Sequence, residues 1–265
     1  MSNILDEIIA NKRKEIARFK PLSSLERFER DGFFWKVGNR SLKAALELPA
    51  STGIIAEFKR KSPSKGWFKG KELEVEPVIR AYNDLGAAGI SVLTDEQYFG
   101  GDLDDLIQSK VISDVPVLRK DFIIDRWQVA ESKAFGADVI LLIASSLTPQ
   151  QVKEFAGYAK SIGLESLLEI HNEKELEHIC DEVDMVGVNN RNLETFEVNI
   201  DTSLRLIEKL PGEKVAIAES GISDVDTIVK LRKAGFKGFL IGENFMKKDD
   251  PGLAFENFVI ELQSR

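Results

Sequence analysis

The chain has 265 residues, of which 43% are hydrophobic and 30% are charged, and its formal net charge is −8 at pH 7. No apolar run reaches the roughly 18 residues that a membrane-spanning helix needs, so we expect a soluble globular protein with no membrane partner. The negative charge argues against general affinity for nucleic acid, although it leaves room for a local cationic pocket that binds a small anion.

The N-terminal stretch, MSNILDEIIANKRKEIARFK, has charged residues between its apolar positions. It therefore lacks the continuous apolar segment of a secretory signal, and we expect a cytoplasmic protein. The single cysteine, Cys180, excludes an internal disulfide framework and a multi-cysteine metal site. His171 and His178 do not have the spacing of a His-x-x-x-His metal pair. The acid and base groups of an active site are therefore expected to be lysine, glutamate and aspartate.

Residues 1–50 precede the first predicted strand, and we expect them to form a helical extension packed on the rest of the chain. The segment is short for a hydrophobic core of its own, so the sequence predicts one domain over residues 1–265. Its first part predicts an amphipathic helix, with Ile4, Ile8, Ile9 and Ile16 on roughly one face. An aromatic cluster, Phe33-Phe34-Trp35, follows, and then a second helical piece near Leu42–Leu46.

From residue 53 onward, short apolar runs alternate with longer amphipathic segments. Several runs are apolar at consecutive positions, which is typical of parallel strands covered on both faces. The amphipathic segments predict helices, and four of them end in a glycine, which stops a helix in the left-handed conformation: Gly86, Gly136, Gly163 and Gly235. The apolar runs predict eight strands, over residues 53–59, 89–94, 116–121, 138–143, 165–170, 185–190, 214–220 and 238–243.

Eight consecutive strand–helix units predict an α/β fold, the closed (β/α)8 or TIM barrel, for which about 250 residues is typical. An open doubly wound sheet is the alternative, and the absence of a G-x-G-x-x-G turn weighs against it. In a barrel the active site lies at the carboxyl ends of the strands. Ionisable side chains are therefore expected to gather at that end.

Charged and amide side chains do follow the predicted strands. On the first strand, Glu57 and Lys59 share one face, because side chains alternate along a strand. If Phe58 faces the helices, both charges face the barrel interior, where a charge is costly unless it is paired or used. The later strands end with Lys120 and Asp121, with Glu169, with Asn189 and Arg191, and with Glu219 and Ser220.

Two interpretations of these charges stay open for any single residue. The groups form either a structural ion-pair network or an acid–base site. Two interior lysines among at least three glutamates favour the second, because opposite charges and desolvation can move pKa values toward neutrality. The neighbouring pair Arg60-Lys61 is expected to be solvated. The stretch after it carries Gly66 and Gly70 and is expected to form a mobile loop over the site.

Two glycine-containing segments are candidates for binding a phosphate group. Ser220-Gly221-Ile222 follows the seventh strand and Gly242-Glu243-Asn244 follows the eighth, and these two loops often build the phosphate site of a barrel. Backbone N–H groups beside a glycine can approach an anion closely. Each segment taken alone is equally compatible with an ordinary tight turn.

These motifs resemble the indole-3-glycerol phosphate synthase family. The similarity covers nearly the whole chain, and its most specific part is the E-x-K-x-x-S-P signature within IIAEFKRKSPSKG. The other segments that carry it are ILDEIIANKRKEI, LTDEQYFGG, VLRKDFI, LLEI, GVNNRNL, AESGIS and LIGENFM.

The resemblance implies a (β/α)8 barrel that acts as a carboxy-lyase in tryptophan biosynthesis. The implied reaction closes the pyrrole ring of 1-(2-carboxyphenylamino)-1-deoxyribulose 5-phosphate to give indole-3-glycerol phosphate, with loss of CO2 and water. No metal and no organic cofactor are implied. The partner is a small phosphorylated substrate, and contact with other tryptophan-pathway enzymes is compatible with the resemblance.

The resemblance also implies catalytic roles by position. Lys120 matches the general acid that protonates the ketose oxygen while the ring carbon attacks. Lys59 matches a second catalytic lysine, considered for acid catalysis of the dehydration, and Glu57 matches its partner base. Glu169 and Asn189 match the remaining catalytic positions, where Glu169 stabilises cationic character or moves protons.

The implied substrate contacts fall into three groups. Ser62 and Arg191 are expected to meet the substrate carboxylate, and Glu219 is expected to support the side of the pocket that faces the ring. The phosphate is expected to lie against Ser220, Gly221, Gly242 and Glu243, and the apolar wall for the aromatic ring is expected to comprise Phe99, Phe122, Leu141 and Ile143.

One position departs from the family pattern. Many relatives have serine where this chain has Glu243, and an acidic side chain aimed at a phosphate would repel it. We therefore expect phosphate contact there through the backbone, with the Glu243 side chain pointing away. Two other functions stay open: a phosphate-binding isomerase or Schiff-base aldolase with Lys120 as nucleophile, and a barrel kept as a binding module without turnover.

Overall fold

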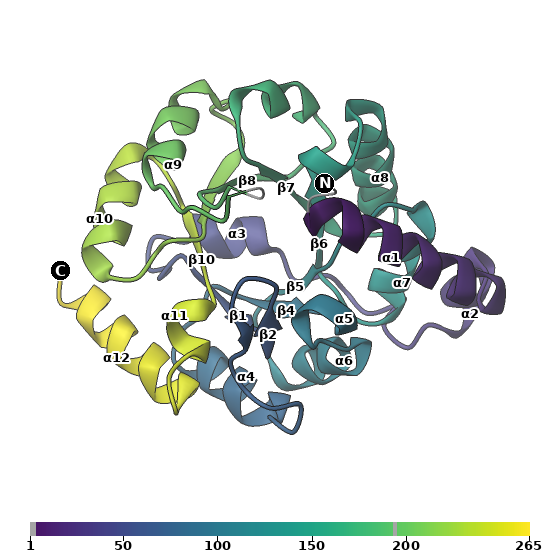
Figure 1. The fold of residues 1–265 in the computed structure, drawn as a ribbon, viewed down its shortest axis with the longest axis horizontal. Helices are drawn as coiled ribbons and strands as arrows, with labels where there is room; N and C mark the ends of the chain where they lie inside the picture. Colours follow the sequence, from purple (N-terminus) through teal and green to yellow (C-terminus); the bar gives the residue numbers. More distant parts are fainter. Residues whose placement is uncertain (1–3, 193–194) are drawn as a thin grey trace.

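The computed structural model describes residues 4–192 and 195–265. Within them, parallel strands close into a barrel surrounded by helices (Figure 1). Each strand is hydrogen-bonded to the strands before and after it, and β1 pairs with both β4 and β10 to complete the ring. The strands are β1 (Ile54–Phe58), β4 (Gly89–Leu93), β5 (Val117–Lys120), β6 (Val139–Ile143), β7 (Glu165–Ile170), β8 (Met185–Asn189), β9 (Val215–Glu219) and β10 (Gly238–Ile241).

All eight predicted strands are confirmed, and the barrel is closed rather than open. The four predicted glycine stops are also confirmed, because Gly86, Gly136, Gly163 and Gly235 all have positive φ. The helices of the outer ring are α4 (Val75–Asp84), α6 (Leu103–Ile112), α7 (Arg126–Ala134), α8 (Pro149–Ser161), α9 (Asp201–Leu206), α10 (Val225–Ala234) and α12 (Pro251–Gln263). Shorter helical turns are η2 (Ala144–Ser146), η3 (Glu173–His178), η4 (Ile207–Lys209), α5 (Glu96–Phe99) and α11 (Glu243–Met246).

The alternation of side chains along the strands divides the core into two parts. Ile54 and Phe58 of β1 belong to the outer core between the strands and the helices, whereas Ile55 belongs to the barrel interior. Glu57 therefore faces inward, as predicted. The interior is closed at the amino end of the strands by Leu42 and Leu46, which are almost fully buried. The functional groups consequently lie at the opposite, carboxyl end.

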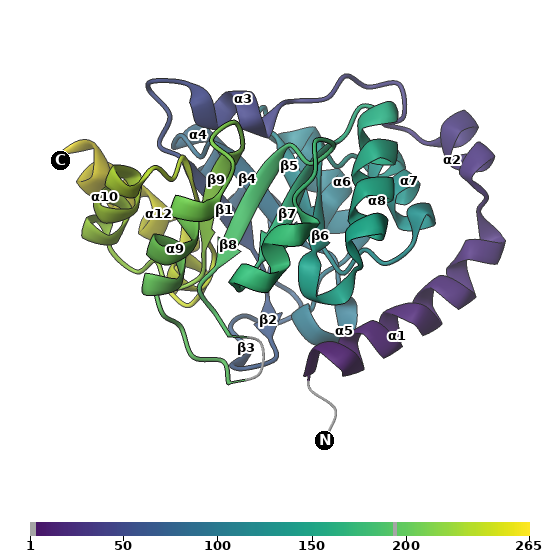
Figure 2. The ribbon, with the colours of Figure 1, turned by 90° about the horizontal axis from the view of Figure 1, so that it is seen from above.

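The N-terminal extension runs from one end of the barrel to the other (Figure 2). It comprises α1 (Ile4–Phe19), η1 (Lys20–Leu22), α2 (Leu25–Asp31) and α3 (Leu42–Glu47). In the view of Figure 2, α1 lies at the end where β2, β3 and α5 lie, and α3 lies at the opposite end. The sequence predicted α1 and α3 but did not predict α2.

Polar and aromatic contacts attach this extension to the barrel. Phe28 of α2 packs on Trp127 of α7, with ring centroids 5.5 Å apart. Lys12 of α1 is buried, and its Nζ lies 3.1 Å from Asp95 Oδ2 and 3.0 Å from Asp121 Oδ1. A buried cation that is matched by two carboxylates holds α1 in one place at the carboxyl end of the strands.

The segment after β1 corrects one expectation. Arg60 is not solvated: it is buried, and its Nη2 donates to Asp105 Oδ1 at 3.0 Å and to Leu73 O at 2.8 Å. The following residues form a short antiparallel hairpin, β2 (Lys61–Ser62) and β3 (Gly66–Trp67).

Among the helices of the described ranges, none is long and apolar enough to cross a membrane.

Candidate active site

A cavity of about 410 Å³ opens at the carboxyl ends of the barrel strands. Its walls come from strands and loops that are far apart in the sequence, from the first strand to the loop after the last. Every site residue that the sequence predicted lies on its wall: Glu57, Lys59, Ser62, Phe99, Lys120, Phe122, Leu141, Ile143, Glu169, Asn189, Arg191, Glu219, Ser220, Gly221, Gly242 and Glu243.

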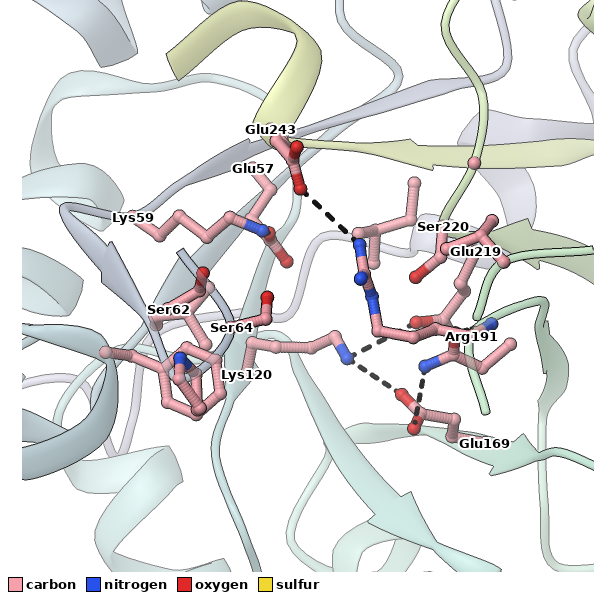
Figure 3. Close-up of a pocket in the computed structure, with 18 of the residues that line it drawn as sticks. Glu57, Lys59, Ser62, Ser64, Lys120, Glu169, Arg191, Glu219, Ser220 and Glu243 are labelled. Carbon is pink, nitrogen blue, oxygen red and sulfur yellow. Dashed lines mark hydrogen bonds and ion pairs between the residues drawn. The ribbon is translucent and has the colours of Figure 1, made fainter. Parts of the chain in front are cut away.

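Lys120 stands at the centre of the charged side chains (Figure 3). Its Nζ lies 2.8 Å from Glu169 Oε2 and 3.3 Å from Glu219 Oε2. Asn189 Nδ2 donates to the other oxygen of Glu169 at 3.1 Å. Neighbouring strands β7, β8 and β9 supply these three partners, and β5 supplies the lysine. The arrangement is a largely buried lysine between two carboxylates, and one of them, Glu169, is held by both Lys120 and Asn189.

The two carboxylates of this cluster, Glu169 and Glu219, have pKa values shifted in opposite directions. Burial alone lowers the pKa of Lys120, but the charges of Glu169, Glu219 and Glu57 outweigh it and raise that pKa. Burial raises the pKa of Glu219 to about 8, helped by the nearby charge of Glu169 and opposed by Lys120. Burial acts in the same direction on Glu169, but Lys120 and His171 outweigh it and hold its pKa well below the usual range. Near neutral pH the cluster therefore holds one ionised carboxylate, one protonated one and a lysine with its proton.

A second lysine–glutamate pair lies on β1 and the residue after it. Lys59 Nζ is 2.6 Å from Glu57 Oε1, and both side chains are largely buried. Ser62, on the hairpin that follows, has a buried Oγ without a hydrogen-bond partner in the described residues. A buried hydroxyl on a cavity wall is suited to donate to a bound ligand, because it loses little solvation when the ligand arrives.

Two glycines make room for the inward carboxylates. A Cβ on Gly187 of β8 would lie 2.1 Å from Oε1 of Glu219, and a Cβ on Gly242 would lie 2.4 Å from Oε1 of Glu57. Neither distance is possible for real atoms, so these side chains occupy their positions only because the neighbouring residue lacks a Cβ. Gly187 was not predicted as part of the site, since a glycine in a strand has many explanations.

The loop after β9 has an unusual backbone. Ser220 and Gly221 both have positive φ, 65° and 76°. Serine rarely adopts this conformation, so the surrounding structure must enforce it. Asn190 helps to hold the loop in this conformation, because its Nδ2 donates to Ser220 O at 3.1 Å and its backbone N donates to Glu219 O at 2.9 Å. Two consecutive left-handed residues turn the loop sharply at the edge of the cavity.

The side chain of Glu243 was expected to point away from the phosphate, which stays a prediction, and the structure shows which group it faces instead: Arg191. Its carboxylate lies on the cavity wall, with Oε2 3.4 Å from Arg191 Nη2 (Figure 3). The physical reason is the nearby guanidinium, which offers the acidic side chain a partner inside the pocket. The two side chains are 33% and 25% exposed, so water screens the pair in part.

Apolar side chains form another part of the cavity wall. The rings of Phe99 and Phe122 lie with centroids 6.0 Å apart and planes tilted by 35°. Leu141 and Ile143 of β6 are almost fully buried and extend the wall toward the barrel interior. The cavity thus places a flat apolar surface beside paired charges, as a substrate with an aromatic ring and anionic groups requires.

Several parts of the site were not predicted. Ile4, Leu5 and Ile8 of α1 line the cavity mouth, although the sequence indicated only that this helix packs on the barrel. The available signal was an apolar stripe at the start of the helix, which does not reveal what the stripe covers. His171 was also missed: its Nε2 lies 3.2 Å from Glu169 Oε1. Its position two residues after Glu169, on the same face of the strand, was the available signal.

Within residues 4–192 and 195–265, no three or more His, Cys, Asp or Glu side chains come together in an arrangement that could hold a metal ion.

Two solved structures of tryptophan synthase show the same architecture at low sequence identity. The tryptophan synthase α2β2 complex of Pyrococcus furiosus contains a chain that aligns with a TM-score of 0.59 at 18% identity, over 80% of this chain and 97% of that one. The tryptophan synthase A-subunit of the same organism aligns with a TM-score of 0.59 at 16% identity, over 80% and 97%. At these identities the likeness shows the fold alone.

Sequence relatives are much closer. Indole-3-glycerol phosphate synthase of Bacteroides thetaiotaomicron is 48% identical over 263 residues, which cover 99% of this chain and all of that protein. The enzyme of the same description from Polaromonas naphthalenivorans is 43% identical over 260 residues, 96% of this chain and 97% of that protein. The family model for indole-3-glycerol phosphate synthase matches residues 5–258. The chain therefore belongs to the indole-3-glycerol phosphate synthase family.

Proposed function

We propose that this protein closes the indole ring of indole-3-glycerol phosphate from 1-(2-carboxyphenylamino)-1-deoxyribulose 5-phosphate, with release of CO2 and water. The observation that carries the proposal is the largely buried Lys120 between Glu169 and Glu219, beside an aromatic wall of the same cavity. Family membership and the motif positions support the same reaction.

Lys120 is the general acid of the first step. The ring carbon that bears the carboxylate attacks the ketose carbonyl, and the carbonyl oxygen gains negative charge as the carbon–carbon bond forms. Glu169 and Glu219 keep Lys120 protonated until that stronger base appears. The lysine then gives its proton to the oxygen, and loss of CO2 restores the aromatic ring.

Lys59 and Glu57 serve the dehydration. The hydroxyl formed in the first step leaves as water after it gains a proton, and the lone pair of the nitrogen assists its departure. The methylene carbon beside the nitrogen then loses a proton, which forms the carbon–carbon double bond of the pyrrole ring and leaves the N–H in place. The 2.6 Å contact between Lys59 Nζ and Glu57 Oε1 places an acid and a base side by side for these two transfers. Burial of the pair excludes competing water.

The ends of the substrate are held by the remaining groups. Arg191 and Ser62 bind the carboxylate, and the backbone around Ser220-Gly221 and Gly242 binds the phosphate. Arg191 contacts Glu243, so the substrate carboxylate replaces Glu243 at the guanidinium when it binds. Asn189 donates to Glu169 and keeps that carboxylate aligned.

The experiment is incubation of the purified protein with the carboxyphenylamino ketose phosphate while indole fluorescence is followed. We expect a fluorescent product, and its absence at every pH from 6 to 9 would sink the proposal. Treatment with borohydride tests the alternative Schiff-base aldolase. A substrate-dependent covalent adduct on Lys120 would favour the aldolase, and we expect none.

The proposal also covers the location of the protein in the cell and its contact with other proteins. A cytoplasmic location fits a biosynthetic enzyme of this family, and fractionation of cells that make the protein tests it. Contact with other tryptophan-pathway enzymes stays a prediction, which cross-linking of the purified proteins followed by mass spectrometry tests.

A further inference from the structure

The catalytic carboxylate Glu169 has a third neighbour beyond Lys120 and Asn189. His171 Nε2 lies 3.2 Å from Glu169 Oε1, the oxygen that also accepts from Asn189. The two residues stand on the same face of β7 and its extension, because side chains two positions apart point the same way. Their side chains are 10% and 3% exposed. His171 is not one of the described residues that line the cavity, so it acts on a bound substrate only through Glu169.

The other side of the imidazole faces a second carboxylate. His171 Nδ1 lies 3.3 Å from Glu175 Oε2, and the backbone N of His171 donates to the same oxygen at 2.7 Å. Asn172 Nδ2 donates to Glu175 Oε1 at 2.8 Å. Glu175, in η3, is thus tied to the segment that carries the histidine. This fixes the ring in one orientation.

The imidazole has a carboxylate oxygen within 3.3 Å of each nitrogen, as a hydrogen bond at Nδ1 and as a charge contact at Nε2. Two negative charges on opposite sides of the ring favour the doubly protonated cation over the neutral ring. Burial lowers the pKa of His171, but the contacts with Glu169 and Glu175 outweigh it and raise the pKa to about 9. Lys120, Glu169, His171 and Glu175 then form a row of alternating charge that runs from the cavity to η3.

We propose that His171 is a positioning residue for the reaction: its imidazolium keeps Glu169 ionised and fixed against Lys120, so that the proton stays on the lysine. The inference rests on the proposed roles of Lys120 and Glu169. Without the cation, burial would favour a protonated Glu169, which leaves Lys120 with a weaker counter-charge. The charges that act directly on the ring are Glu169 from β7 and Glu175 from η3, and Lys120 from β5 acts through Glu169.

Nuclear magnetic resonance tests the charge state without any assay of activity. The chain has two histidines, so labelling with ¹⁵N-histidine gives two imidazole signals, which a His171→Gln variant assigns. We expect both ring nitrogens of His171 to be protonated at pH 7, with a midpoint near pH 9. In Glu169→Gln the midpoint should fall by about one pH unit or more. A His171 ring that is neutral at pH 7 in the unmodified protein would overturn the inference.

Kinetics test the consequence. We expect His171→Gln to lower kcat about 10-fold or more at pH 7, to change KM by less than about 3-fold, and to move the acidic limb of the pH profile upward by about one unit. His178→Gln is the matched control: that ring is also buried, but its nitrogens face the carbonyl oxygens of Leu147 and Glu175. It should leave the position of the limb unchanged.

The outcomes separate the two proposals. If the unmodified protein does not turn over the substrate, the proposed function fails, and the resonance measurement still decides the charge of His171. If the unmodified protein is active and His171→Gln keeps its pH profile, the positioning role fails. A loss of kcat by the same factor at every pH, together with a lower Tm, would assign His171 a structural role only.

Discussion

The Nζ atom of Lys120 lies 2.8 Å from Oε2 of Glu169, and the two residues reach this contact from strands β5 and β7, which are not neighbours in the barrel. The contact therefore crosses the barrel interior, and both side chains are largely buried. A charge pair in this position is retained at a cost in desolvation, which is typical of groups that serve chemistry.

Two replacements of Lys120 test whether it acts as a proton donor or only as a positive charge. Lys120→Met should lower kcat by about 100- to 10,000-fold, the usual contribution of a general acid, with substrate affinity largely kept. Lys120→Arg keeps the charge but cannot release a proton, so it should be almost as inactive. Steady-state kinetics and calorimetric binding provide the readouts. Recovery of most of the activity by arginine would show that the charge alone suffices.

The space beside Glu219 depends on the glycine next to it. In Gly187→Ala, the new Cβ would lie 2.1 Å from Glu219 Oε1, so the carboxylate must move away from Lys120. We expect kcat to fall at least about 10-fold, with a loss of about 1–3 kcal/mol in the free energy of unfolding from the crowded interior. Both are measured on the same preparation by kinetics and by urea denaturation.

Gly157→Ala is the control for the glycine substitution. Gly157 lies within helix α8, and the nearest atom to its added Cβ is Glu182 Cγ at 3.6 Å, an ordinary contact. Alanine should therefore stabilise the protein by about 0.5–1 kcal/mol without any effect on turnover. Unchanged kinetics in Gly187→Ala would mean that Glu219 does not need its present position.

The raised pKa of Glu219, about 8, makes stability depend on pH. The folded state holds this proton more tightly than the unfolded state, whose carboxyl has the usual value of 4.5. The stabilising contribution is therefore complete below pH 4.5 and is lost as the pH rises through 8. The raised pKa of His171, about 9, acts in the same direction between pH 6.5 and 9. We expect the Tm of the ligand-free protein to fall between pH 7 and 9.

Glu219→Gln isolates the first of these two groups. The amide resembles the protonated acid and cannot ionise, so the variant should have a higher Tm than the unmodified protein at pH 9 and a flatter dependence on pH. Its turnover should nonetheless be lower, because the carboxyl group is lost from the site. A Tm profile parallel to that of the unmodified protein would contradict the assignment of the raised pKa to Glu219.

The ion pair between Arg191 and Glu243 should oppose substrate binding. Glu243→Gln keeps the size of the side chain but frees the guanidinium for the substrate carboxylate and removes a negative charge near the phosphate. The pair is partly exposed and hence worth about 0–1 kcal/mol, so KM should fall by about 2- to 5-fold with little change in kcat. An increase in KM would show instead that Glu243 holds Arg191 in its binding position.

The barrel and the charged residues at the ends of its strands were predictable from local patterns, whereas Ser62 and the apolar wall of Phe99, Phe122, Leu141 and Ile143 were expected only from the family resemblance. The eight strands follow from apolar runs, four of which begin shortly after a helix that a glycine stops. The inward direction of Glu57 and Lys59 follows from the two-residue period of a strand. Once the ends of the strands are known to meet, the charged residues that follow them must share one cavity.

The features that the sequence did not predict depend on neighbours distant in the chain. Glu243 turns into the cavity because Arg191 is there, and Arg60 is buried because Asp105 and Leu73 accept its hydrogen bonds. The charge of His171 arises from two carboxylates that only the fold brings to its two nitrogens. No residue pattern within one segment contains this information.

The central claim is that this cavity forms the ring and releases CO2 in one reaction. The most direct measurement uses substrate labelled with ¹³C in the anthranilate carboxylate and follows ¹³CO2 and indole-3-glycerol phosphate together. We expect the two to appear in equal amounts and at the same rate, and both to appear at least about 100-fold more slowly with Lys120→Met. Consumption of the substrate without labelled CO2, or binding of the substrate without any product, would contradict the claim.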